Sequence, residues 1–451
     1  MQSRNPLLVP EIRECIADGN VAPIHELCTA VHPAAVAELI AALEPPEIWQ
    51  VLRHAPALAR AEIFSHLESE LQVETAAIIP IDDLARLVDE MPADDRVDLL
   101  KLLPEDLRDA VLPRLSQTER EDIRKLSAYE ERTAGAIMTS DHATLREEWT
   151  AAQAIDALRR DAPNKETIYY AYVVDVAGRL LGCVSLRNLI LANPDALIRD
   201  IMKTNVLFVR TDEDQEEALH VMQKYDLIAL PVVNGDNRLV GIITVDDIMD
   251  VGEEEATTDF HRMATVGAVE TGMKEAGLWA LYRARTPWLM ILVFVNIFSG
   301  AGIAYFEHTI ETVVALVFFL PLLIDSAGNA GAQAATLIVR AMATDDVAMR
   351  DWFRLLVRDI VICLFIGLTM ALAVSSVAAV RAPEVMVPVA LSMLCIVMFG
   401  SLVGTMLPFL LTRLKLDPAT ASGPLVTSLA DIGGVIIYFS IATWYLGLGM
   451  V

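Results

Sequence analysis

The sequence has few of the side chains that usually hold catalytic metals. It contains only five cysteines, and their positions show no metal-ligand spacing, so we expect packing thiols in a reducing compartment. They are Cys15, Cys28, Cys183, Cys363 and Cys395. The only histidine after His261 is His308, so the second half lacks the His-Glu-x-x-His pattern of a zinc protease. These absences argue against an intramembrane protease, and we predict that the protein is not an enzyme.

Basic residues are missing from one stretch of the chain that is crowded with acids. No lysine or arginine occurs between Leu239 and His261. The carboxylates in this stretch are Asp246, Asp247, Asp250, Glu253, Glu254, Glu255 and Asp259. At helical spacing they repel one another unless a cation intervenes. We therefore expect them to lead into a long amphipathic connecting helix, over residues 252–285, that senses a divalent ion.

Charge divides the chain near residue 285. Residues 286–451 carry 10 Asp and Glu against 7 Lys and Arg, whereas residues 1–285 carry 51 against 28. An acidic surface of this kind repels nucleic acid and concentrates cations. The alternative is that the acids only keep the protein soluble. The opening Met1-Gln-Ser-Arg-Asn-Pro has no apolar run typical of a secretory leader. We expect a cytosolic acidic half with no nucleic-acid partner.

Five apolar segments after residue 285 are long enough to cross a lipid bilayer. They are Trp288–Phe306, Val313–Met342, Leu356–Val380, Val385–Leu411 and Thr420–Leu448. The connections alternate between arginine-rich and arginine-poor, and positive loops stay on the cytoplasmic side. The sequence predicts a multi-pass protein of the cell inner membrane, with its N-terminus in the cytoplasm and its C-terminus outside.

Polar side chains interrupt the second and fifth apolar segments. Asp431 lies within the fifth, where a carboxylate at bilayer depth costs about 2.5–3.5 kcal/mol and usually lines a cavity or meets a cation. In the second, Asp325, Asn329 and Gln333 follow one another at four-residue spacing, which predicts one helix face. We infer that the protein moves something positive, because a sensor without transport would have no use for Asp431.

The cytosolic half combines a helical part with an internal repeat. Residues 1–132 contain short amphipathic stretches with prolines at their starts, which predicts an all-α superhelical domain. Residues 133–251 repeat a helix and two strands, Ala151–Arg160 with Tyr170–Ser185 and Glu216–Tyr225 with Ile228–Thr244. This α/β duplication resembles a tandem CBS domain. That resemblance implies a nucleotide site at Ser185, Asn188 and Thr244, although helix capping by the hydroxyls also explains them.

The order of these parts resembles the MgtE family of magnesium channels over essentially the whole chain. Its most specific motifs are Gly-Asn-x-Gly-x-Gln at Gly328–Gln333 and the run from Pro424 to Asp431. The resemblance implies a homodimer with one pore, in which Asp431 of both subunits holds hydrated Mg²⁺. It also implies pore-lining roles for a set in the second and fifth spans: Asp325, Gly328, Asn329, Gln333 and Pro424.

The resemblance further implies that cytosolic Mg²⁺ closes the pore by bridging the soluble domains. The matching regulatory positions are Glu62, Asp94, Asp98, Glu216, Asp226, Asp247, Asp250, Glu255, Asp259 and Asp417. We therefore expect four parts, residues 1–132, 133–251, 252–285 and a five-helix transmembrane domain at 286–451. The expected ligands are Mg²⁺ and ATP. A broader transporter of Co²⁺, Mn²⁺ or Ni²⁺ is the alternative, because contacts through water select weakly between ions.

Overall fold

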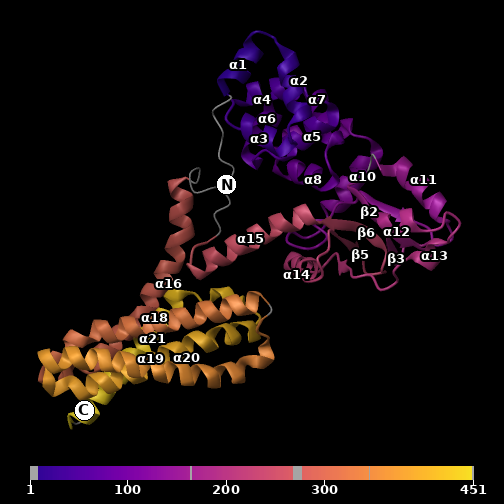
Figure 1. Cartoon of the computed structure of the whole chain (residues 1–451). Helices are drawn as coiled ribbons and strands as arrows, with labels where there is room; N and C mark the ends of the chain where they lie inside the picture. Colours follow the sequence, from indigo (N-terminus) through magenta and orange to yellow (C-terminus); the bar gives the residue numbers. More distant parts are fainter. Residues whose placement is uncertain (1–8, 163–164, 268–276, 345, 449–451) are drawn as a thin grey trace. The chain divides into compact units, whose positions relative to one another are not determined.

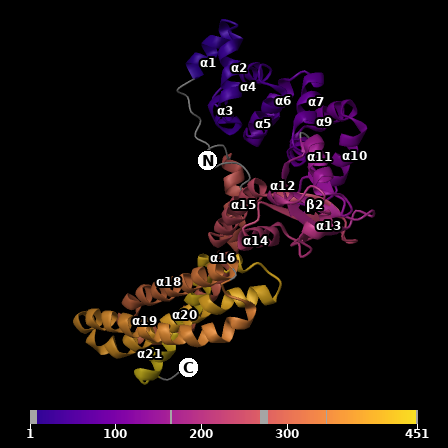
Figure 2. The same ribbon diagram turned by 45° about the vertical axis from the view of Figure 1, so that its right-hand side comes forward.

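The computed structural model describes residues 9–162, 165–267, 277–344 and 346–448. The chain forms two compact units, Met1–Glu253 and Glu254–Val451. The first combines short helices with two small sheets, and the second consists of long helices (Figures 1 and 2). The elements of both units agree with the predicted fold class.

The N-terminal part of the first unit is a succession of short helices. They are α1 (Val9–Ala17), α2 (Val21–Ala30), α3 (Pro33–Ile40), α4 (Pro45–Leu52), α5 (Ala57–Ser65), α6 (Ser69–Ile78), α7 (Ile81–Glu90), α8 (Ala93–Leu102), α9 (Glu105–Val111), the 3₁₀ turn η2 (Leu112–Arg114) and α10 (Gln117–Leu126). Prolines lie at helix starts as predicted: Pro45 opens α4, and Pro92 and Pro104 precede α8 and α9. From α3 to α8, each helix packs against the helix two places further along the chain. The result is the predicted winding array.

Long polar side chains close the carboxyl ends of several of these helices. The Gln72 side-chain amide donates to the carbonyl oxygens of Phe64 (3.0 Å) and Leu67 (3.0 Å) at the end of α5. Arg96 donates in the same way to the carbonyls of Val88 and Met91 at the end of α7. The last carbonyls of a helix have no partner within it, so these donors remove the cost of burying them.

The repeated part forms two three-stranded sheets of identical order. The elements are β1 (His142–Leu145), α11 (Ala151–Asp161), β2 (Thr167–Val174), β3 (Leu180–Ser185), α12 (Leu186–Leu191) and α13 (Ile198–Ile201), then β4 (Val209–Arg210), α14 (Gln215–Tyr225), β5 (Ala229–Val233) and β6 (Leu239–Thr244). In each copy the first strand runs parallel to the second, which pairs antiparallel with the third. Their turns hydrogen bond to each other, because Leu239 N–H donates to Gly178 O (3.0 Å) and Leu180 N–H to Asn237 O (3.1 Å). The duplication predicted from the sequence is therefore structural.

The acidic stretch forms a helix with bounds different from those expected. Helix α15 (Val245–Met263) begins directly after β6, seven residues before the expected position 252, and ends long before residue 285. Thr265 follows in the left-handed region (φ 57°), which is incompatible with a continuing right-handed helix. The next helix begins at Leu278, and residues 268–276 lie outside the described residues. The expectation of one helix over 252–285 was therefore wrong.

The second unit contains the five predicted membrane-length helices. They are α16 (Leu278–Tyr305), α18 (Ala315–Ala343), α19 (Trp352–Arg381), α20 (Met386–Arg413) and α21 (Gly423–Tyr445), with the shorter α17 (Glu307–Thr312) after α16 and the 3₁₀ turns η4 (Met349–Asp351), η5 (Pro383–Val385) and η6 (Pro418–Thr420) in the later connections. In the part of the chain that the structure describes, these five helices are long and apolar enough to span a bilayer, which agrees with the predicted number. Helix α16 starts ten residues before the expected Trp288.

Helices α18 and α20 pack together with their backbones in close contact. A Cβ atom on Gly404 would stand 2.0 Å from the carbonyl oxygen of Gly331, and one on Gly400 would stand 2.3 Å from that of Ala327. Small residues permit this approach, which any larger side chain would prevent. The buried Tyr438 hydroxyl of α21 also donates to Leu316 O of α18 (2.9 Å). These three helices, α18, α20 and α21, therefore pack closely against one another.

Candidate functional site

Asp431 is a half-buried carboxylate inside a membrane-length helix. It lies eight residues after the first residue of α21, which is about 12 Å at 1.5 Å per residue. Ser422 caps the start of this helix, since its hydroxyl accepts from Leu425 N–H (3.4 Å), and the exposed Pro424 occupies the first turn. Asp431 Oδ1 is buried and has no hydrogen-bond partner among the described residues. An unpaired oxygen at this depth is suited to a cation or to water around one.

Helix α18 brings further oxygen atoms towards Asp431. A Cβ atom on Gly328 would stand 2.8 Å from Thr427 Cγ2, so α18 and α21 are close one helical turn before Asp431. Asp325 is close enough for its charge to act on Asp431. Asn329 donates from Nδ2 to Asp325 Oδ2 (3.0 Å), which leaves the amide oxygen of Asn329 available as an acceptor. The structure therefore groups the predicted residues Asp325, Gly328 and Asn329 around the helix that carries Asp431.

Gln333 lies with a different set of polar residues. It lines a cavity of about 150 Å³ between α18, α19 and α20. In that cavity Asp359 Oδ2 accepts from Thr405 (2.8 Å) and Ser401 (3.3 Å), which ties α19 to α20. The sequence reasoning missed Asp359, although a carboxylate in an apolar segment was the signal used for Asp431. The structure gives no contact between Gln333 and Asp431.

An acidic cluster in the first unit contains two of the predicted regulatory residues. Asp94 and Asp95 open α8, and Asp246 and Asp247 open α15. Burial is the main cause that raises the pKa of Asp94 well above its ordinary value, and the charge of Asp247 adds to it. Burial likewise raises the pKa of Asp247 to about 6, although a hydrogen bond from the Thr244 hydroxyl (2.6 Å) acts to lower it. Buried carboxylates that lie close together favour a proton or a divalent cation.

Three members of this cluster were missing from the predicted site, namely Asp95, Asp246 and Glu166. Burial and the charges of Asp246 and Asp247 raise the pKa of Glu166 to about 7. Asp95 and Asp246 raise the pKa of Asp247 by repulsion, and burial raises the pKa of Asp95 itself. Asp95 and Asp246 each directly neighbour a predicted residue in the sequence, so the doubled acids Asp94-Asp95 and Asp246-Asp247 were the available signal. Asp94 Oδ1 is buried without a hydrogen-bond partner in the described part of the chain. Within the same described ranges, no three His, Cys, Asp or Glu side chains form a ready-made metal site.

Two other predicted regulatory residues border this cluster, since Asp98 adds to burial in raising the pKa of Asp95, and Asp246 adds to burial in raising that of Asp250. Glu62 is exposed on α5, and the exposed Asp98 on α8 pairs with Lys101 (3.1 Å). Glu216 and Asp226 lie at opposite ends of α14, about 15 Å apart along its axis, so one ion does not bridge them within a subunit. Burial and Glu253 raise the pKa of Asp250 on α15.

The remaining three predicted regulatory residues belong to the second unit. Glu255 is buried and Asp259 is half-buried, both on α15. Asp417 lies in the connection before α21 and forms an ion pair with Arg262, close to the end of α15. The roles of all these residues as ion ligands stay predictions.

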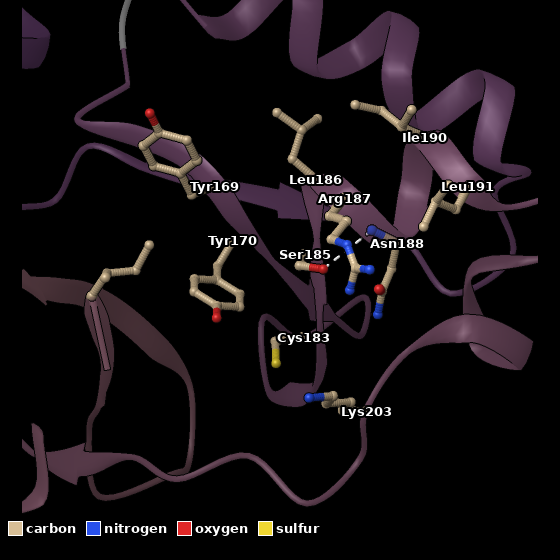
Figure 3. Close-up of a pocket in the computed structure, with 11 residues that line it drawn as sticks. Tyr169, Tyr170, Cys183, Ser185, Leu186, Arg187, Asn188, Ile190, Leu191 and Lys203 are labelled. Carbon is tan, nitrogen blue, oxygen red and sulfur yellow. Dashed lines mark hydrogen bonds between the residues drawn. The ribbon is translucent and has the colours of Figure 1, made fainter. Parts of the chain in front are cut away.

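A pocket of about 750 Å³ in the first copy of the repeat contains two of the three predicted nucleotide residues (Figure 3). Ser185 and Asn188 line it, and Ser185 Oγ accepts from Asn188 N–H (3.2 Å) as the predicted helix cap. Tyr170, Arg187 and Lys203 line it as well, and sequence reasoning missed these three. Thr244 is buried and bonded to Asp247 instead. An aromatic ring beside two cations suits a base and its phosphates.

Comparison with protein-family models matches three families along the chain. Residues 31–132 match the MgtE intracellular N domain, residues 134–195 and 198–254 match CBS domains, and residues 320–441 match the MgtE model described as a divalent cation transporter. The magnesium transporter MgtE of Thermus thermophilus is 40% identical over 448 residues, which cover 96% of this chain and 98% of that protein. The magnesium transporter MgtE of Bacillus subtilis is 36% identical, with 74% of each chain covered.

Two solved structures resemble about half of the chain. The soluble part of a magnesium transporter is 33% identical, with a TM-score of 0.53, and covers 55% of this chain and 97% of that chain. The cytosolic domain of the Mg²⁺ channel MgtE in complex with ATP is 38% identical, with a TM-score of 0.51, and covers 53% and 98%. The architecture, the membrane-length helices and the polar groups inside them define a multi-pass membrane transporter rather than an enzyme. The chain belongs to the MgtE family.

Proposed function

We propose that this chain is a channel for Mg²⁺, and that Asp431 is its main intramembrane ion site. The observation that carries the proposal is the Asp431 carboxylate, which lies inside an apolar helix with one oxygen unpaired. The sequence likeness to magnesium transporters over nearly the full chain supports Mg²⁺ as the ion.

The chemistry near Asp431 fits a hydrated divalent ion. Mg²⁺ prefers oxygen ligands and gives up its water reluctantly, so carboxylates and amides that bind through water allow the ion to pass. Asp325, Asn329 and Asp431 offer only oxygen atoms as acceptors. An inside-negative potential favours entry of a divalent ion by about 4.6 kcal/mol per 100 mV, which is twice the value for one charge. Influx therefore needs no coupled hydrolysis.

Gating by cytosolic Mg²⁺ is the second part of the proposal. Burial and the charges of neighbouring carboxylates raise the pKa values of Asp94, Asp95 and Asp247. Bound Mg²⁺ would neutralise this repulsion and hold the soluble domains in the arrangement that closes the pore. Without Mg²⁺ the same carboxylates favour separation, and the pore opens.

The assembly and its ligands complete the proposal. Two copies form the pore, with α18 and α21 of each copy around the ion path, in the cell inner membrane. The N-terminus faces the cytoplasm, because Arg340, Arg350 and Arg413 lie at helix ends that share one side. ATP binds the pocket that contains Tyr170, Arg187 and Lys203, as its chemistry and the likeness to an ATP-bound cytosolic domain suggest.

Growth and ²⁵Mg²⁺ uptake in a host that lacks its own magnesium transporters test the transport function. The wild type should rescue growth. Uptake by Asp431→Ala, expressed at the same level, should be more than about tenfold lower than uptake by the wild type, because the intramembrane charge is gone. Glu307→Gln, a change of an exposed carboxylate in the connection after α16, should keep wild-type uptake. Uptake that persists in Asp431→Ala would place the ion site elsewhere, and uptake of Co²⁺ or Mn²⁺ in preference to Mg²⁺ would reassign the ion.

A further inference from the structure

An ion pair joins the end of the acidic helix to the connection before the pore helix. Arg262 of α15 donates from Nη1 to Asp417 Oδ2, across 155 positions of sequence, and both residues belong to the second unit. The pair is partly exposed, with 40% of the Arg262 side chain and 34% of the Asp417 side chain accessible. A dissolved ion can therefore reach the carboxylate.

An apolar contact places the arginine beside this carboxylate. Met263, the last residue of α15, packs against a small cluster formed by Val339 of α18, Leu411 of α20 and the connection residues Ala419 and Ala421. The end of α15 is thus anchored to the same short connection that contains Asp417. Apolar packing therefore holds the two partners of the ion pair close together, in addition to their charges.

The connection leads directly into the helix that bears Asp431. Asp417 Oδ1 accepts from Ala419 N–H (2.8 Å), and its carbonyl accepts from Thr420 N–H (3.1 Å), so Asp417 shapes the turn η6. Two residues after η6, Ser422 caps the first turn of α21. A change at Asp417 is therefore close, along the chain, to the start of α21.

Both oxygens of Asp417 are engaged, and one of them by a cation that belongs to the protein. A divalent ion that uses this carboxylate has to displace the Arg262 guanidinium or share the carboxylate with it, since like charges at one carboxylate repel. We propose that Arg262 is a built-in competitor of the regulatory divalent cation at Asp417, and that it sets the cytosolic Mg²⁺ concentration at which the channel closes. This inference rests on the proposed closure by Mg²⁺, in which Asp417 is one of the expected ligands.

Removing the competitor should make closure more sensitive to Mg²⁺. Patch recordings across a range of cytosolic Mg²⁺ should give Arg262→Gln a half-closing concentration about two- to fivefold below that of the wild type, the range expected for a partly exposed ion pair. Lys415→Gln is the matched control, because it removes one positive charge from the same connection two residues from Asp417. It should shift the half-closing concentration less than Arg262→Gln does.

A double mutant separates competition from a general change of charge. In an Asp417→Asn background, Arg262→Gln should have no further effect, because its target is gone. An unchanged or raised half-closing concentration in Arg262→Gln overturns the inference, and a raised value would mean that the ion pair itself holds the closed state. Equal shifts in both backgrounds also overturn it. If wild-type currents do not respond to cytosolic Mg²⁺ at all, the gating proposal fails instead, which is a distinct result.

Discussion

Asp94 in the soluble unit and Asp431 in the membrane unit each bury a carboxylate oxygen that has no hydrogen-bond partner among the described residues. Their surroundings differ. Asp94 meets acids from a separate helix, α15, whereas Asp431 lies among apolar helices with one carboxylate neighbour, Asp325. In the proposed gating, the repulsion at Asp94 would be relieved by separation of α8 from α15. Asp431 lies instead on a helix that packs closely against α18 and α20.

This difference assigns the two sites different tasks. In the proposed gating, the cluster responds to ion concentration because ion binding and contact between α8 and α15 stabilise each other. A carboxylate in a closely packed helix group would present the same charge to each ion that passes it. The soluble cluster is therefore suited to a switch and the membrane site to a fixed point on the ion path, and variants of each unit test this distinction.

The largest effect is expected from removing charge in the soluble cluster. Asp247→Asn combined with Asp250→Asn should raise the half-closing Mg²⁺ concentration by more than about tenfold, where each factor of ten corresponds to about 1.4 kcal/mol. Uptake at low Mg²⁺ should stay at the wild-type level, since the membrane site is intact. Patch recordings measure the first quantity and tracer uptake the second.

A matched control removes the same number of charges at positions outside the cluster. Glu217→Gln combined with Asp236→Asn changes two exposed carboxylates of the same unit. This control should close at the wild-type Mg²⁺ concentration. If both double variants shift equally, the acidic field of the whole unit is responsible and the cluster has no special role.

A smaller effect concerns pH and the stability of the Mg²⁺-free protein. The pKa of Asp247 is raised from 3.8 to about 6 in the folded state, so the folded state binds its proton more tightly than the unfolded state does. Linkage gives the direction: as pH rises from 3.8 to about 6, the free energy of unfolding falls, because the folded state must release this proton. Above about pH 6 the stabilisation by the bound proton is completely lost. Asp94, with its pKa also raised, acts in the same direction.

Thermal unfolding in a chelator at pH 5 and at pH 8 measures this effect. We expect a higher melting temperature at pH 5, and addition of Mg²⁺ at pH 8 should recover part of the difference. Asp247→Asn should show a weaker dependence on pH than the wild type, because one titrating group is removed. A wild type that is more stable at pH 8 than at pH 5 without Mg²⁺ would contradict the assignment of repulsion to this cluster.

The smallest effect is expected at the basic pocket of the first CBS copy. Arg187→Gln should weaken ATP binding by about threefold to tenfold, since a charge-assisted hydrogen bond to phosphate is lost. Arg199→Gln, which changes an exposed arginine outside the pocket, serves as the control. Calorimetric titration of the full chain in detergent with ATP measures both affinities. Absence of binding by the wild type would remove ATP from the proposed ligands.

The features that the sequence alone determined are local or repeated along the chain. Five apolar runs gave five helices, because the length of a hydrophobic run decides whether a helix can span a bilayer. The duplicated pattern predicted two sheets of identical order, and prolines marked helix starts. Asp431 was evident because a carboxylate in such a run is costly wherever the helix is placed.

Tertiary structure alone decided which side chains meet. Gln333 was expected beside Asp325 and Asn329, but eight residues at 3.6 per turn rotate its direction by about 80° from Asp325, and it lines the cavity with Asp359 instead. The crowding of Asp94 and Asp95 with Asp246 and Asp247 depends on helices that are far apart in sequence. The pairing of Asp417 with Arg262 does so as well. Spacing along a chain fixes the faces of single helices, and only their packing determines which faces come into contact.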